Sequence, residues 1–217
     1  MFKKTISLLL FPIAFTGCNS EDLETANFGS SFYKNDYTLV NATDLEIDYH
    51  IANTQLDGDP RDVEKNKYYI DTLSTDSEPK SVTHEHNTNR EITFYIQDHT
   101  HKTKRVKKTY KVKNEQDYHF IAWQNNERLN LSIIQNQSKN KSSFFAIRFL
   151  ASTDMPITIN SKTFNLEQGE ISNWYYVDDC NSDIKFNNEP LSICHTSYDN
   201  SYTLVLDKSG IKATITE

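Results

Sequence analysis

Apolar and polar residues alternate with a period of two along most of the chain after Tyr33. The alternation is clearest in segments 92–96, 129–133 and 211–215, where every second residue is apolar. A period of two with one apolar face is typical of half-buried antiparallel strands. Short runs of the same kind, separated by turn-forming Asn, Gly, Pro and Asp residues, occur at 37–40, 45–51, 118–123, 144–150, 171–177 and 202–206. No window has the 3.6-residue period of an amphipathic helix, so we expect an all-β sandwich or barrel.

Two parts of the pattern repeat along the chain. Segment 42–47 resembles segment 152–157 at an offset of 110 residues, and each follows an apolar run. A hairpin pattern over 118–134 likewise resembles one over 202–215. The repetition predicts two tandem β units, residues 33–137 and 142–217, joined by a polar link. The alternative is a single domain in which short strands resemble each other by chance.

The segment Val40-Asn41-Ala42-Thr43-Asp44 resembles a motif of a bacterial cell-surface family of unknown function. Its members carry immunoglobulin-like β-sandwich repeats that open with a strand ending in an Asn-Ala-Ser/Thr type motif. Leu150-Ala151-Ser152-Thr153-Asp154 is a looser match. The resemblance covers about a tenth of the chain and implies an antiparallel, immunoglobulin-like sandwich at the cell surface. It brings no catalytic residues.

The N-terminus has the features of an export signal. Met-Phe-Lys-Lys precedes an apolar stretch from Ile6 to Phe15, which is too short to span a bilayer. Phe15-Thr16-Gly17-Cys18 resembles the lipobox of bacterial lipoproteins, with Phe in place of the usual Leu. The resemblance implies a signal peptide over residues 1–17 and acylation of Cys18, for instance with palmitate. The alternative is a plain secreted protein with an unpaired thiol near its start.

The residues around the lipobox suggest a location. Residues 18–32 are polar and lack any period, which is typical of a flexible tether. Asn19 follows the cysteine, which by resemblance to enterobacterial sorting implies the outer membrane, on its periplasmic or surface face. The bilayer would then be the first partner of the protein, through acylated Cys18.

The cysteine count agrees with an exported lipoprotein. Three cysteines are an odd number for an oxidising compartment, and acylation of Cys18 leaves Cys180 and Cys194 as a pair. We therefore expect a disulfide between them, with two buried thiols as the alternative.

The chain is acidic, with a formal net charge of −7 that becomes −9 when Lys3 and Lys4 leave with the signal. Such a charge gives no overall attraction for nucleic acid, and we expect no intracellular nucleic acid as a partner. One segment departs from this balance: residues 102–113 carry seven positive charges and no negative one. It is a candidate patch for an anionic polymer, formed by Lys102, Lys104, Arg105, Lys107, Lys108, Lys111 and Lys113. The alternative is an edge strand whose lysines prevent edge-to-edge pairing.

Six of the seven histidines lie between His50 and His119. The pairs His84/His86 and His99/His101 have the i, i+2 spacing that puts two imidazoles on one face of a strand, so each is a weak candidate metal site. A strand over 90–97 would separate the two pairs too far for one shared site. We favour polar loop residues without a bound metal for both pairs, and a structural role for His119.

Catalytic signatures are absent from the sequence. The chain has only five glycines and lacks both a phosphate-cradling loop and a Gly-x-Ser-x-Gly elbow. We expect no catalytic residues and no cofactor. The favoured function is a non-enzymatic binding or spacer module that contacts an envelope protein or polysaccharide. One alternative is an accessory lipoprotein that docks on a secretion, adhesion or polysaccharide assembly, for instance by strand addition at an edge. The other, less favoured, is a hydrolase.

Overall fold

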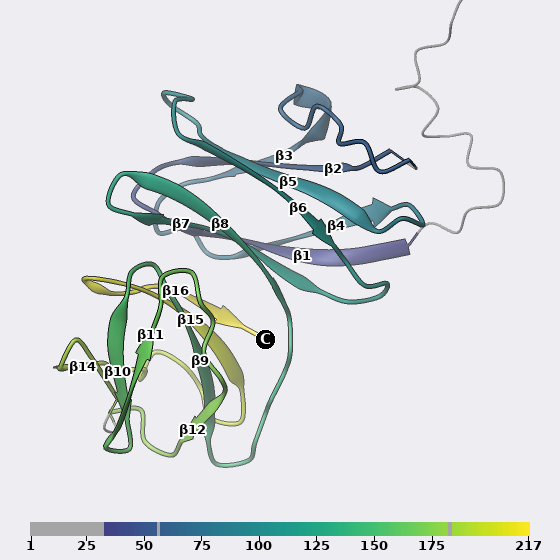
Figure 1. Ribbon diagram of the computed structural model, residues 1–217. Helices are drawn as coiled ribbons and strands as arrows, with labels where there is room; N and C mark the ends of the chain where they lie inside the picture. Colours follow the sequence, from purple (N-terminus) through teal and green to yellow (C-terminus); the bar gives the residue numbers. More distant parts are fainter. Residues whose placement is uncertain (1–32, 56, 182–183) are drawn as a thin grey trace, which may run out of the picture. The chain divides into compact units, whose positions relative to one another are not determined.

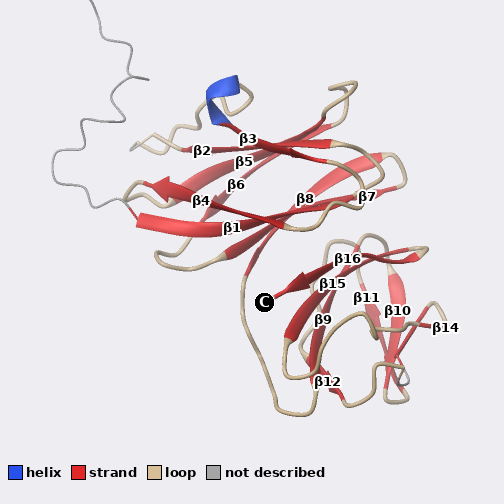
Figure 2. Ribbon diagram, turned by 180° about the vertical axis from the view of Figure 1, so that it is seen from behind, coloured by secondary structure: helices blue, strands red, loops and turns tan. Residues whose placement is uncertain are grey.

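The computed structural model describes residues 33–55, 57–181 and 184–217, which belong to one compact unit, Ser31–Glu217. The described residues form β-strands with a single 3₁₀ turn, η2 (Asn66–Tyr68), drawn in blue in Figure 2. The predicted signal peptide, the tether and Cys18 lie outside the described residues.

The first sandwich contains two four-stranded sheets, ordered β4-β1-β7-β8 and β3-β2-β5-β6 (Figure 1). β1 runs parallel to β7, and the other neighbours are antiparallel. Alternate residues of the two sheets face each other and form a core rich in aromatic side chains, among them Tyr37, Tyr49, Phe94 and Phe120. The strands are β1 (Tyr33–Ala42), β2 (Ile47–Asn53), β3 (Tyr69–Leu73), β4 (Lys80–His86), β5 (Glu91–Asp98), β6 (Arg105–Lys111), β7 (Tyr118–Asn125) and β8 (Arg128–Gln135).

The second sandwich repeats this topology strand for strand. Its sheets are ordered β12-β9-β15-β16 and β11-β10-β13-β14, so each strand of the first sandwich corresponds to the strand eight places later. β9 again runs parallel to β15, as β1 does to β7. The strands are β9 (Phe145–Ala151), β10 (Met155–Ile159), β11 (Lys162–Leu166), β12 (Tyr175–Val177), β13 (Ile184–Phe186), β14 (Glu189–Pro190), β15 (Ser201–Asp207) and β16 (Gly210–Thr216). The prediction of an all-β fold with two tandem sandwich units is confirmed.

The register of the strands agrees with the offset found in the sequence. Tyr37 of β1 lies opposite Tyr118 of β7, and Ile147 of β9 lies opposite Tyr202 of β15. Tyr37 and Ile147 are separated by the same 110 residues as the repeated segments 42–47 and 152–157. The repeat in the sequence is therefore a repeat of structure.

A third apolar cluster contains residues of both sandwiches. Val40, Ile121 and Trp123 of the first are buried together with Leu150, Val205 and Ile215 of the second. These side chains point away from the core of their own sandwich. Their burial explains why the last four residues of β1 are all buried, although strict alternation would leave every second one exposed.

Candidate functional site

The basic segment found in the sequence forms an edge strand. β6 pairs with β5 from Arg105 opposite Gln97 to Lys111 opposite Glu91, and it has no second partner in the sheet. Val106 and Tyr110 point inward and pack against the core of the first sandwich. Residues 105, 107, 109 and 111 share the opposite face, because neighbouring side chains of a strand alternate. Three of those four residues are cationic.

Five of the six lysines of this segment are exposed, and none has a side-chain partner among the described residues. Lys102, Lys107, Lys108, Lys111 and Lys113 are exposed, and Lys104 is half-buried. Arg105 is the one member with an ion pair in the described part of the chain, since its Nη1 lies 2.9 Å from Oε2 of Glu64. The ammonium groups of the six lysines form no hydrogen bond or ion pair with any described residue. We refer to these six lysines and Arg105 as the basic edge.

The edge position of β6 is compatible with both explanations of its positive charge, protection of the sheet edge and binding of an anionic polymer. An edge strand with lysines resists pairing with another strand, because the approaching backbone would have to desolvate them. Exposed ammonium groups along a strand, such as those of Lys107 and Lys111, which share one face about 13 Å apart, also attract a polyanion. The two explanations differ in what they predict for binding, which is measurable.

The two histidine pairs lie at different places. His84 Nε2 lies 3.1 Å from Oδ1 of Asn53, at the end of β2, while His99 Nδ1 lies 2.7 Å from Oδ1 of Asp48, near its start. The opposite ends of β2 therefore keep the pairs apart. No three His, Cys, Asp or Glu side chains within the described ranges are grouped as metal ligands.

The environments of the paired histidines also differ. Burial, with a smaller effect of neighbouring His86, lowers the pKa of His84 to about 4. His86 is fully buried and stacks on Tyr33 with ring centroids 5.6 Å apart. His99 instead accompanies a carboxylate, and its hydrogen bond to Asp48 raises its pKa. His101 is exposed. The prediction of polar loop residues is therefore wrong for His84 and His86, which lie on β4 because their strand pairs with β1, and it holds for the exposed His99 and His101 in the turn after β5.

Cys180 and Cys194 form the predicted disulfide. The bridge closes a loop that carries β13 and β14. It therefore fixes the part of the second sandwich that lies beside the groove described next.

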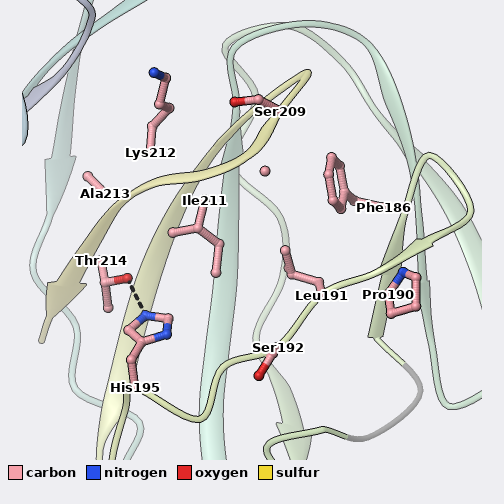
Figure 3. A pocket seen from close by; sticks show the side chains of 11 residues that line it. Phe186, Pro190, Leu191, Ser192, His195, Ser209, Ile211, Lys212, Ala213 and Thr214 are labelled. Carbon is pink, nitrogen blue, oxygen red and sulfur yellow. Dashed lines mark hydrogen bonds between the residues drawn. The ribbon is translucent and has the colours of Figure 1, made fainter.

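A groove of about 510 Å³ lies beside β16, the edge strand of its sheet. Figure 3 shows Phe186 and Leu191 on one side of the groove and Ile211 on the other, while Lys212 points away from them. The Nε2 of His195 lies 2.8 Å from Oγ1 of Thr214. A second hollow, of about 540 Å³, shares four lining residues with the first, His195, Lys212, Ala213 and Thr214. The two hollows thus follow the same strand.

A buried charged cluster escaped the sequence analysis. The carboxylate of Glu217 is inaccessible to solvent and lies 3.1 Å from Nε2 of His119 and 2.7 Å from Nη2 of Arg148. It also accepts hydrogen bonds from the backbone N–H of Gln137, at 2.8 Å, and from the hydroxyl of Thr203. Burial alone would raise the pKa of Glu217, but His119, Arg148 and Thr203 together lower it below its ordinary value. His119 thus has the kind of environment expected of a structural histidine.

Sequence patterns gave no signal for this cluster. Its members come from β7, the segment between β8 and β9, β9, β15 and the residue after β16. No two of them are close enough in sequence to form a motif, and they meet only in the folded chain.

None of the described residues forms a helix that is long and apolar enough to cross a membrane. A comparison with models of known protein families finds no match for this chain, and a comparison with curated protein sequences finds none either.

Proposed function

We propose that this chain is a lipid-anchored protein of a bacterial envelope, whose tandem sandwiches act as a non-enzymatic binding module. The proposed ligand is an acidic polysaccharide of the envelope, held by the basic edge. One observation carries the proposal: in an acidic chain, five exposed lysines and the half-buried Lys104 lie on and beside one edge strand without an ion-pair partner among the described residues.

The arrangement favours a polymer over a small anion. A small anion is usually enclosed by donors that converge from several directions, whereas β6 presents its cations in a row. Lys107 and Lys111 share one face of β6 and Lys108 lies on the other, so a flexible chain with many carboxylates meets several ammonium groups at once. Such a contact gains affinity from many weak ion pairs, each worth up to about 1 kcal/mol.

The location rests on the sequence. The resemblance of residues 15–18 to a lipobox supports a ligand in the envelope, and the polar composition of residues 18–32 supports a tether between the bilayer and the sandwiches. The missing catalytic motifs favour binding over hydrolysis. The accessory role, in which the protein docks on an envelope assembly, would use a different surface, the groove beside β16.

Binding to polygalacturonate at low and at moderate salt tests the ligand. We expect the triple variant Lys107→Gln, Lys108→Gln, Lys111→Gln to lose about tenfold or more in affinity, because three exposed charge contacts disappear. Wild-type affinity should fall steeply as salt rises. The matched control replaces the exposed lysines Lys139, Lys162 and Lys185 with Gln and should bind as wild type does.

Equal affinities for the two triple variants would contradict the proposal and leave protection of the sheet edge as the role of the lysines. Duplex DNA and vesicles with anionic headgroups serve as competitors. Stronger binding to either of them than to polygalacturonate would replace the proposed ligand.

The anchor is tested separately. In bacteria that express the full chain, Cys18→Ala should move the protein from the membrane fraction to the soluble fraction and remove its acyl label. Cys18→Ala with unchanged fractionation and unchanged processing would refute the lipoprotein assignment. The control Cys180→Ala, Cys194→Ala leaves the lipobox intact and should remain with the membrane.

A further inference from the structure

The two sandwiches differ at one seam between their sheets. In the first, β6 has seven residues and packs beside β8, which brings the edges of the two sheets together. The corresponding strand of the second, β14, has only two residues, Glu189 and Pro190. No comparable approach joins β14 to β16, the counterpart of β8. The groove of about 510 Å³ lies at this seam, bordered by Pro190 on one side and by β16 on the other.

The outer edge of β16 presents free backbone groups to the groove. The N–H of Glu217 donates to the C=O of Ser201 at 3.0 Å. This bond identifies Glu217 and Ser201 as a hydrogen-bonded pair of the β15–β16 ladder. In an antiparallel ladder the bonded pairs alternate with unbonded ones, so Thr214 and Thr216 direct their N–H and C=O groups away from β15. Those groups have no backbone partner among the described residues. Such an edge pairs with an extended chain.

The side chains along the groove change character from one end to the other. Phe186, Leu191 and Ile211 give the first hollow an apolar patch, beside the hydroxyl groups of Ser192 and Ser209. The second hollow is bordered by the carboxylates of Asp76 and Glu78, neither of which lies within 4 Å of a cation in the described ranges. The ammonium of Lys212 is bound by Asp44 at 2.6 Å and lies 3.8 Å from Asp207. The groove therefore joins an end with an apolar patch to an acidic end.

We propose that β16 is a strand-addition site for an extended segment of a partner protein. The segment has apolar side chains at alternate positions, which fill the hollow at Phe186 and Leu191, and a lysine or arginine next to Asp76 and Glu78. About six or seven residues span the length of β16. Backbone bonds to Thr214 and Thr216 supply affinity, and the two ends of the groove set the orientation. This surface is separate from the basic edge, so a partner protein and a polysaccharide have different binding sites.

Synthetic peptides test the chemistry of the partner. The probe is a peptide in which valine and threonine alternate and one end carries two lysines; its matched control carries two glutamates in place of the lysines. We expect the lysine peptide to bind the oxidised protein about tenfold more tightly than the glutamate peptide, because only the former meets Asp76 and Glu78 with opposite charge. Asp76→Lys with Glu78→Lys should reverse the preference.

A proline at position 214 tests the backbone edge. Thr214→Pro removes an N–H that points to the groove and leaves the ladder with β15 intact, so the second sandwich should keep its fold. We expect it to weaken binding of the lysine peptide about tenfold or more, since a backbone bond is lost and the ring occupies its place. Thr214→Ala keeps the N–H and should bind within about twofold of wild type.

Several outcomes would overturn the proposal. One is equal binding by Thr214→Pro and wild type, with circular dichroism showing the same fold. Another is the failure of both peptides to shift the amide resonances of Thr214 and Thr216 at millimolar concentration. A concentration-dependent dimer that Thr214→Pro dissociates would assign the edge to a second copy of this chain and not to a partner protein. None of these outcomes depends on the basic edge, because polygalacturonate binding is measured independently.

Discussion

The carboxylate of Glu217 lies 3.1 Å from Nε2 of His119, and neither side chain is accessible to solvent. His119 belongs to β7 of the first sandwich, while Glu217 follows β16 of the second. The guanidinium of Arg148 lies 2.7 Å from the other carboxylate oxygen and also donates to the backbone C=O of Gln135 at 3.1 Å. The carboxylate thus connects residues of both sandwiches and of the segment between them.

This relationship predicts that the protein loses stability in acid. The pKa of Glu217 is lower in the folded protein than its ordinary value of 4.5, because His119, Arg148 and Thr203 outweigh the effect of burial. A carboxyl group with a lowered pKa stabilises the fold above its unfolded-state value, and that contribution is lost as the pH falls through the folded-state value. We therefore expect the free energy of unfolding to decrease as the pH falls below about 4.5.

The variant Glu217→Gln measures this contribution. It leaves Arg148 buried without a carboxylate, and we expect it to cost roughly 3 kcal/mol at pH 7. In urea titrations from pH 7 to pH 3, the difference from wild type should shrink toward the acid end, because wild type loses the same interaction there. Glu127→Gln, at an exposed position, is the control. A constant difference across this range would show that ionisation of Glu217 does not stabilise the fold.

The sequence predicted the features that arise from local patterns. Alternation in segments such as 92–96 identified strands because a sheet with one buried face imposes a period of two. The 110-residue offset identified the tandem repeat. The assignment of Cys18 to the lipid left Cys180 and Cys194 as a pair, and they form the disulfide.

The remaining features depend on contacts between distant segments. Val40 and Ala42 are buried on the outer side of β1, because a second apolar face covers them. The Glu217 cluster has no local motif. The basic run had an edge strand as one of its two explanations, and β6 does pair with β5 alone, but which strand it would pair with depends on the whole sheet. The short β14, which leaves the groove open, could not be predicted from the sequence either, because a strand of two residues is too short to show alternation.

A pair of equivalent tyrosines provides a test of the repeat. The hydroxyl of Tyr118 accepts the backbone N–H of Lys113 at 2.9 Å, and that of Tyr202 accepts the N–H of Ser197, also at 2.9 Å. Each bond joins a tyrosine to the residue five places earlier in its own sandwich. Tyr118→Phe and Tyr202→Phe should each cost about 1 kcal/mol, since each leaves one backbone N–H without its acceptor.

Urea unfolding of the two variants checks this prediction, with Tyr176→Phe at a partly exposed position as the control. Similar losses for Tyr118→Phe and Tyr202→Phe, with no loss for the control, support equivalent roles. A loss in one variant only would show that the repeat conserves the topology without conserving this hydrogen bond.

The disulfide should stabilise the second sandwich selectively. Cys180 and Cys194 are 14 residues apart, and a loop of this length contributes about 3 kcal/mol through the lower entropy of the unfolded chain. The bridged segment carries β13, which pairs with β10 and completes the second core. Cys180→Ala with Cys194→Ala should therefore raise hydrogen exchange in β10 and β13, and leave β2 and β5 of the first sandwich protected.

Reduction of the wild-type protein with dithiothreitol gives the same comparison without a change of sequence and should reproduce the exchange pattern of the double variant. Because Pro190 and Leu191 lie within the bridged loop and line the groove, reduction should also weaken binding of the lysine peptide at β16. Equal loss of protection in both sandwiches would mean that they unfold as one cooperative unit. In that case the buried Glu217 cluster and the shared apolar cluster would couple the two sandwiches so strongly that loss of the disulfide destabilises both.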